Sequence, residues 1–266
     1  MQKYSIFNLI KNAFSNHQKW DLAWKDPTPK KEYDVVIIGG GGHGLATAYY
    51  LAKEHNITNV AIIEKGWIGG GNVGRNTTII RSNYMHDDNA LFSEFGMDLW
   101  RKMSQDLNYN VMFSPRGIIN LAHSDAQMNV YARRGNSMRL NGIDAELLNR
   151  EQVREIIPMA DFSENVRFPI FGGLMQPSAG TARHDAVAWG YARQADSMGV
   201  DIIQNCEVIG FDISGGKVEG VRTSRGDIKV KKIGLCVAGS TNILADKLNM
   251  TLPIETHLLQ ACVSEP

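Results

Sequence analysis

A glycine-rich turn near the start of the chain is the segment whose residue spacing points most directly to chemistry. Residues 39–44 read GGGGHG and match the pattern G-x-G-x-x-G. In this pattern Gly39 permits a tight turn after a strand, Gly41 lets the backbone approach a pyrophosphate, and Gly44 lets the next helix pack closely on the strand. The sequence therefore predicts a site for a ligand with two linked phosphates.

The residues around this turn support the same prediction. The amides of Gly42 and His43 would lie at a helix N-terminus, where the helix dipole favours phosphate, and His43 is expected to contribute its amide rather than its ring. Glu64 follows Gly44 by 20 residues and ends an apolar run. A carboxylate at this position accepts hydrogen bonds from ribose hydroxyls, so we predict a dinucleotide site that also includes Lys65.

A second glycine-rich segment indicates which dinucleotide is bound. Residues 65–76 read KGWIGGGNVGRN and begin directly after Glu64. A nicotinamide dinucleotide does not need a second loop of this kind, whereas the longer FAD would be held by a second backbone clamp. A flexible surface loop is the alternative interpretation. We expect FAD.

Two longer segments resemble a known family. Residues 64–84, EKGWIGGGNVGRNTTIIRSNY, resemble the FAD-dependent amine oxidases of the D-amino-acid-oxidase superfamily and, more narrowly, the beta subunits of heterotetrameric sarcosine oxidase. Residues 175–196, MQPSAGTARHDAVAWGYARQAD, strengthen the narrower resemblance. Beta subunits of that family are longer, so this chain is expected to be truncated at its C-terminus. The absent part would hold the last FAD contacts and part of the substrate domain.

The resemblance implies two flavins, a noncovalent FAD and an FMN attached covalently through His184. A neutral imidazole nitrogen can attack the activated 8-methyl carbon of a flavin, and Arg183 would stabilise negative charge on the flavin ring. Without the resemblance, His184 would be interpreted as a helix cap or a hydrogen-bonded core residue. The resemblance places Val208 at the adenine, and the FAD diphosphate and flavin beside Asn72, Arg75, Asn76, Thr77 and Ile79.

The resemblance also suggests a substrate ligand. Arg81 matches the arginine that holds the substrate carboxylate in monomeric relatives, and a guanidinium fork suits a carboxylate. A surface or ribose-side arginine fits the sequence equally well. Gly74 and Thr78 stand where those relatives have a histidine and an arginine beside the flavin. Detailed active-site roles are therefore not transferred, and the catalytic base is left unassigned.

The hydrophobic pattern predicts the elements that position these motifs. A strand at 33–38, a helix at 44–53 and a strand at 59–63 form a βαβ unit. The middle of the chain predicts helices at 91–103, 126–140 and 150–156 and a strand at 113–121. The last part predicts a helix at 185–198 and strands at 200–204, 207–213, 217–223, 228–230 and 233–238, with a strand-like segment at 255–265.

We therefore predict an α/β fold, in which an α+β substrate domain interrupts a Rossmann-like FAD-binding domain. The FAD-binding domain would comprise residues 31–90 and 165–245, and the incomplete substrate domain residues 91–164 and 246–266. Residues 1–30 would form an N-terminal helix and linker. The apolar residues between positions 6 and 14 recur at helical spacing without any arginine, which favours a helix docked on the body or a partner over a transit peptide.

Composition excludes several classes of partner. Lys plus Arg and Asp plus Glu both number 28, so the chain carries no net charge, and we expect no nucleic acid. No apolar run reaches the roughly 18 residues of a membrane span, so we expect no membrane and a cytoplasmic protein. The cysteines Cys206, Cys236 and Cys262 lack metal-ligand spacing and are expected to be buried thiols, with no metal site.

The resemblance implies oxidation of sarcosine by hydride transfer to FAD, with electrons passing to FMN and then to oxygen, which gives hydrogen peroxide. The partners would be alpha, gamma and delta subunits, with tetrahydrofolate and NAD bound to the alpha subunit. The products would be glycine and formaldehyde or 5,10-methylenetetrahydrofolate. An FAD-only amine dehydrogenase and a catalytically silent flavoprotein scaffold are the alternatives.

Overall fold

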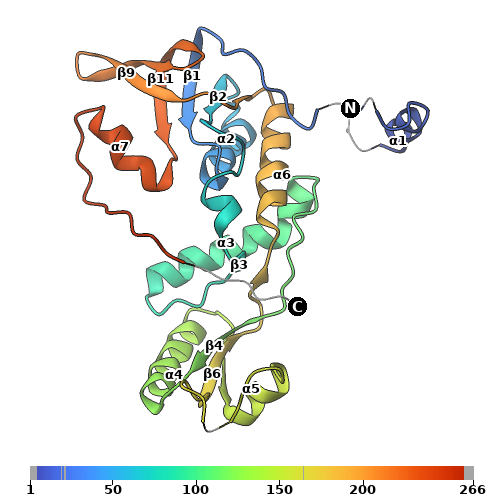
Figure 1. Cartoon of the computed structure of the whole chain (residues 1–266), viewed down its shortest axis with the longest axis vertical. Helices are drawn as coiled ribbons and strands as arrows, with labels where there is room; N and C mark the ends of the chain where they lie inside the picture. Colours follow the sequence, from blue (N-terminus) through green and yellow to red (C-terminus); the bar gives the residue numbers. More distant parts are fainter. Residues whose placement is uncertain (1–4, 19, 21, 164, 261–266) are drawn as a thin grey trace. The chain divides into compact units, whose positions relative to one another are not determined.

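The computed structural model describes residues 5–18, 20, 22–163 and 165–260, which form two compact units (Figure 1). Of the described residues, the first unit takes those up to Gly74 together with Tyr191–Leu259, and the second takes Arg75–Gly190. The first unit is therefore built from two separated stretches of sequence. The roles expected for the two units, FAD binding and substrate binding, remain predictions.

The first unit is built on a six-stranded sheet with the order β8-β2-β1-β11-β10-β9. Its parallel part contains β8 (Asp201–Ile203), β2 (Val60–Ile63), β1 (Glu32–Ile38) and β11 (Gly226–Leu235). The strands β10 (Lys217–Thr223) and β9 (Val208–Ser214) extend it as an antiparallel hairpin. The helix α2 (Gly42–His55) connects β1 to β2. This arrangement confirms the predicted α/β fold and its βαβ unit.

The strand β2 and the end of β1 are buried because they carry only aliphatic side chains. Every residue of β2 is buried, and the last three residues of β1 are buried as well. A strand covered on both faces needs such a continuous apolar run. The core therefore fixes the carboxyl ends of β1 and β2, and these ends carry Gly39 and Glu64.

The second unit contains a three-stranded antiparallel sheet with the order β4-β6-β5 and two helices packed on it. Figure 1 shows α4 and α5 beside this sheet. The short strands β3 and β7 form a separate antiparallel pair. In the sequence, β3 comes before the three strands of the sheet and β7 comes after them. The elements are β3 (Ile79–Ile80), α3 (Asp87–Asp106), β4 (Ile118–Ala122), α4 (Asp125–Leu140), β5 (Glu146–Asn149), α5 (Arg150–Ile156), β6 (Gly172–Gln176) and β7 (Gly180–Thr181). The helix α6 (His184–Ser197) begins in the second unit and ends in the first.

Several strand predictions were wrong. The predicted strands 228–230 and 233–238 are replaced by one strand, β11, because its parallel pairing with β1 keeps one register from Lys229 to Leu235, and residues 236–238 lie outside it. The strand predicted at 113–121 is reduced to β4 because Gly117 has a φ of +84°, which breaks the extended chain after Pro115. Ser114 forms only an isolated bridge with Thr181.

The remaining elements are short helices. The helix α1 (Ile6–Ala13) forms as predicted, but its apolar residues Ile6, Phe7 and Leu9 are exposed, and docking on a partner remains a prediction. The other short elements are η1 (Asn72–Arg75), η2 (Ala238–Ser240) and α7 (Thr241–Asp246). Residues 255–260 form no strand, and the rest of the strand-like segment lies outside the described residues.

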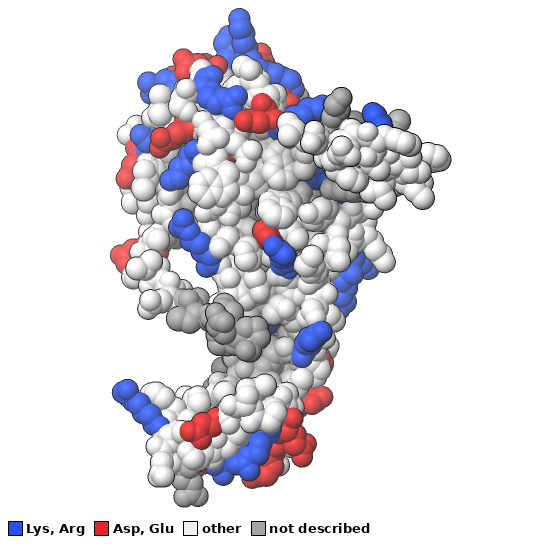
Figure 2. Space-filling model, turned by 45° about the vertical axis from the view of Figure 1, so that its right-hand side comes forward, with Lys and Arg blue, Asp and Glu red and all other residues white. Residues whose placement is uncertain are grey.

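The surface charges, the helices and the thiols bear on the predictions made from composition. Basic and acidic side chains lie interspersed on the face shown in Figure 2. No described helix has the length and apolar character needed to cross a bilayer. Cys206 is buried, and burial raises the pKa of the half-buried Cys236 thiol. Cys262 lies outside the described residues.

Candidate functional site

The turn between β1 and α2 leaves no room for side chains at two of its glycines. Gly39 has a φ of +111°, and a Cβ atom there would lie 2.3 Å from the carbonyl oxygen of Cys236. A Cβ atom on Gly44 would lie 2.0 Å from the carbonyl oxygen of Gly39. Both contacts are far below van der Waals distance and involve backbone atoms, which cannot swing away. The turn therefore depends on glycine for its geometry.

The start of α2 presents an open row of backbone amides. Gly41 is the N-cap residue, its backbone is extended, and it offers no side-chain cap. A Cβ atom on Gly41 or Gly42 would meet only the Cγ2 atom of Val73, at 3.8 and 3.5 Å. The first N–H groups of a helix have no partner inside the helix, and their dipoles favour an anion. This cradle fits a diphosphate, with the exposed His43 contributing its amide.

Glu64 joins the two glycine-rich segments. Its Oε2 accepts a hydrogen bond from the Gly40 amide at 2.7 Å, and its Oε1 accepts one from the Gly66 amide at 2.9 Å. A carboxylate has about four acceptor sites, so two remain for ribose hydroxyls. The structure therefore places Glu64 beside the turn, as the dinucleotide prediction requires, while the neighbouring Lys65 is exposed.

The second glycine-rich segment is held by hydrogen bonds rather than loose. The Gly69 amide donates to the Gly40 carbonyl at 3.2 Å, which ties this segment directly to the first turn. The Ile68 amide donates to Oε1 of Gln204 at 2.9 Å. The segment then continues into η1, where Asn72 is exposed. Two backbone clamps of the first unit therefore lie side by side.

The second unit brings the other predicted flavin residues together in two adjacent segments. Ile79 pairs with Thr181 across β3 and β7, and the Ala182 amide donates to the Thr78 carbonyl at 3.1 Å. Thr78 has a φ of +62°, and its amide donates to Oδ1 of Asn76 at 2.7 Å. These bonds place the segment around Thr77 next to the segment that carries Arg183 and His184. The exposed Arg75 precedes the first of them.

His184 carries an unsatisfied buried atom. It begins α6, and its Nδ1 is buried with no hydrogen-bond partner among the described residues. Buried polar atoms almost always have partners, so this nitrogen is one that an absent group would satisfy. The site therefore fits a flavin held at this imidazole.

The side chains flanking His184 form an ion pair. Nε of Arg183 donates to Oδ1 and Oδ2 of Asp185 at 2.8 and 3.1 Å, and the Ala186 amide donates to the same Oδ1 at 2.8 Å. Burial raises the pKa of the Asp185 carboxyl, but these bonds and the nearby positive charges together lower it below its ordinary value. Asp185 thus fixes the orientation of the Arg183 guanidinium.

Arg81 follows β3 and is held by its neighbours. Its Nη1 donates to Oδ1 of the buried Asn83 at 2.6 Å, and its guanidinium lies 5.1 Å from the centre of the Tyr84 ring. Sequence reasoning missed Asn83 and its second partner, Arg134, because that contact joins residues 51 positions apart.

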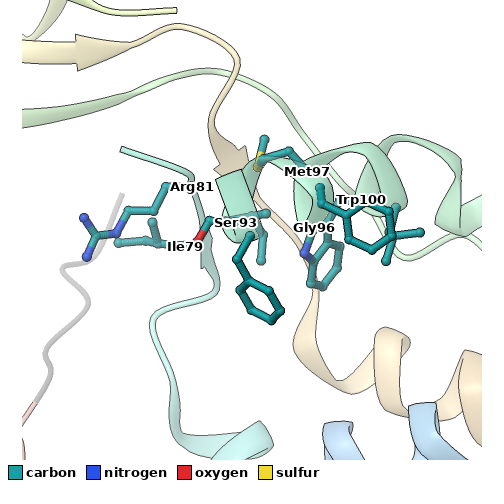
Figure 3. Close-up of a pocket in the computed structure, with 10 residues that line it drawn as sticks. Ile79, Arg81, Ser93, Gly96, Met97 and Trp100 are labelled. Carbon is teal, nitrogen blue, oxygen red and sulfur yellow. The ribbon is translucent and has the colours of Figure 1, made fainter. Parts of the chain in front are cut away.

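A pocket of about 320 Å³ lies between β3 and α3 in the second unit. Figure 3 shows that the Arg81 side chain extends away from Met97 and Trp100, so its stem lines the pocket while the guanidinium points elsewhere. Most of the lining is apolar, and its residues are Ile79, Ile80, Arg81, Phe92, Ser93, Phe95, Gly96, Met97, Leu99 and Trp100.

Val208 is the predicted site residue with the deepest side chain. It begins β9 and packs in the hydrophobic core of the first unit. A contact with adenine remains a prediction.

Comparison with known families decides the class of protein. The family described as DAO, FAD dependent oxidoreductase, matches residues 34–266. The chain belongs to this DAO family of FAD-dependent oxidoreductases. This membership accounts for the two glycine segments joined at Glu64 and confirms the expected oxidoreductase class and FAD as cofactor.

Within the DAO family, the chain is similar to proteins named sarcosine oxidase subunit beta, as expected. It is 59% identical over 263 residues to that of Rhizobium meliloti (strain 1021), covering 99% of this chain and 63% of the relative. It is 52% identical over 266 residues to that of Rhodobacter capsulatus, covering 100% of this chain and 64% of the relative. The chain thus spans less than two thirds of the length of these relatives.

Solved DAO-type structures share the fold. The L-proline dehydrogenase of P. horikoshii aligns with a TM-score of 0.76 and 26% identity, over 83% of this chain and 57% of that chain. The glycine oxidase of Bacillus cereus ATCC 14579 aligns with a TM-score of 0.70 and 24% identity, over 80% of this chain and 57% of that chain.

Proposed function

We propose that this chain is the FAD-binding part of a sarcosine oxidase beta subunit, located in the cytoplasm. The observation that carries the proposal is the 59% identity to such a subunit over nearly the whole chain. FAD would accept a hydride from the N-methyl group of sarcosine. The chain's own task is to hold the dinucleotide and to orient the substrate.

The glycine cradle and Glu64 would bind the dinucleotide end of FAD. The amides of Gly41 to Gly44 would hold the diphosphate, and the two unused acceptor sites of Glu64 would bind ribose hydroxyls. The backbone around Val208 would contact the adenine. We propose contacts nearer the flavin for Asn72, Arg75, Asn76, Thr77 and Ile79, with Lys65 at the ribose side. Arg81 would bind the substrate carboxylate.

The proposal includes an FMN attached covalently at His184. The unsatisfied Nδ1 of His184 and the oriented guanidinium of Arg183 support it, because they offer an imidazole and a positive charge at one place. The FMN would pass electrons to oxygen. The whole assembly would include alpha, gamma and delta subunits, with tetrahydrofolate and NAD on the alpha subunit.

Acid denaturation of the flavin-loaded complex tests this proposal. Flavin fluorescence should remain with the beta polypeptide, and His184→Ala should release that fraction while FAD stays bound before denaturation. Covalent flavin retained in His184→Ala would contradict the assignment.

An FAD-only amine dehydrogenase is the second candidate, favoured by the structural likeness to the L-proline dehydrogenase of P. horikoshii. Complete release of flavin from the wild-type complex in acid would favour this candidate.

A further inference from the structure

Two arginine side chains of the second unit converge on one neutral residue. Nη1 of Arg81 donates to Oδ1 of Asn83 at 2.6 Å, and Nη2 of Arg134 donates to the same oxygen at 3.1 Å. Nε of Arg134 also donates to the Asn83 carbonyl at 2.5 Å, and its Nη2 donates to that carbonyl as well. Asn83 is fully buried, and its Nδ2 donates to Oδ1 of Asn120 at 2.7 Å. Asn83 is therefore fixed on three sides.

This cluster has two positive charges and only neutral acceptors. Among the described residues, neither Arg81 nor Arg134 forms an ion pair with a carboxylate. Burial lowers the pKa of Arg134, and the charge of Arg81 lowers it further. Partly buried cations without counter-charge cost free energy, so the cluster favours an anion.

The hydrogen bonds also determine which edge of Arg81 is available. Asn83 takes a hydrogen from Nη1, whereas Nε and Nη2 of Arg81 have no hydrogen-bond partner among the described residues. These two nitrogens form the edge of the guanidinium that binds a carboxylate through two parallel hydrogen bonds. A small carboxylate, which has two acceptor oxygens, therefore fits this edge better than an anion that offers a single acceptor atom.

We propose that Asn83 and Arg134 are positioning residues of the substrate carboxylate site: they hold Arg81 by Nη1 so that its Nε–Nη2 edge faces the carboxylate. This inference rests on the proposed role of Arg81. Arg134 fixes the backbone and side chain of Asn83 and adds a second positive charge. The amide of Asn83 orients Arg81 without cancelling its charge, which an aspartate at this position would do.

The variant Asn83→Asp separates positioning from mere structural support. It keeps the shape and the acceptor and adds a carboxylate that pairs with both arginines. The Nδ2 donor to Asn120 is lost, and a rotated Asn120 amide group can replace that hydrogen bond by donating to the new carboxylate. In the flavin-loaded complex, we expect the Kd for acetate, followed by flavin absorbance, and the KM for sarcosine to rise at least about tenfold. The thermal unfolding midpoint without ligand should be equal to that of the wild type or higher. A residue that only supports the fold would not give weaker binding together with equal or greater stability.

Substitutions of two neighbouring arginines provide the second test. Arg134→Gln should raise the KM for sarcosine, and Arg134→Lys should restore part of the affinity with kcat within about twofold of wild type. Arg133→Gln removes the same charge from an exposed side chain of α4 and should leave KM unchanged.

Two outcomes would overturn the inference in distinguishable ways. In the first outcome, Asn83→Asp binds acetate as the wild type does while Arg81→Met loses affinity for acetate. The positioning role is then wrong and the role of Arg81 stands. If Asn83→Asp fails to fold, Arg134→Gln takes its place in this comparison. If Arg81→Met also binds acetate normally, the proposed role of Arg81 fails, and the positioning role fails with it.

Discussion

At the scale of single residues, the glycine turn shows how far spacing alone determines a site. The positions of Gly39, Gly44 and Glu64 were predictable because their spacing follows from the geometry of a βαβ unit. The bonds from the Gly40 and Gly66 amides to Glu64 were not predictable, since they require both loops to be folded. The Arg134 contact to Asn83 was equally invisible, because no local pattern joins the two residues.

Gly44→Ala tests the turn. The added Cβ would lie 2.0 Å from the Gly39 carbonyl, so β1 and α2 would have to separate. We expect a loss of at least about 2 kcal/mol in the free energy of unfolding and loss of FAD, measured by urea denaturation and by flavin absorbance. Gly234→Ala is the matched control, because its Cβ would meet only Cγ1 of Ile37 at 3.8 Å. Normal FAD content in Gly44→Ala would contradict the prediction.

At the scale of elements, local signals predicted helices better than strand boundaries. The helix α5 has the predicted bounds, and its start is fixed by a capping box of Asn149 and Gln152. The extent of β11 depends on its pairing with β1, 190 residues or more away in the sequence, and short apolar runs do not reveal such pairing. The pairing between distant strands thus determines strand boundaries that the local sequence pattern does not define.

Asp185 in the first turn of α6 gives a pH-dependent prediction. Its pKa in the folded protein is below the ordinary 3.8, so the ionised form stabilises the fold above that pH, and this stabilisation is lost as the pH falls through the lower, folded value. Asp185→Asn should lower the free energy of unfolding by about 0.5–1 kcal/mol at pH 7.

Urea unfolding at pH 7 and at the lowest pH at which the protein stays folded measures this effect. The difference between variant and wild type should shrink at the lower pH. Asp88→Asn is the matched control with a smaller effect, because Asp88 lies in the first turn of α3 and forms no ion pair within the described part of the chain. A difference independent of pH would contradict the prediction.

At the scale of the whole molecule, the proposed function predicts a response to substrate. In the complex with its partner subunits and without oxygen, sarcosine should bleach the visible absorbance of the flavin, because the cofactor is reduced. The spectrum should not change with sarcosine if the subunit is a silent scaffold. The same titration with a secondary N-methyl amine lacking a carboxylate should give weaker bleaching, since it offers nothing to Arg81.

The two hydrogen bonds of Glu64 affect the free-energy cost of binding the cofactor. The carboxylate is already held in one rotamer by two amides, so an arriving nucleotide does not have to immobilise it. Freezing a flexible side chain on binding costs about 0.5–1.5 kcal/mol, and preorganisation removes this cost. In its proposed role, Glu64 would therefore bind the ribose hydroxyls without this cost.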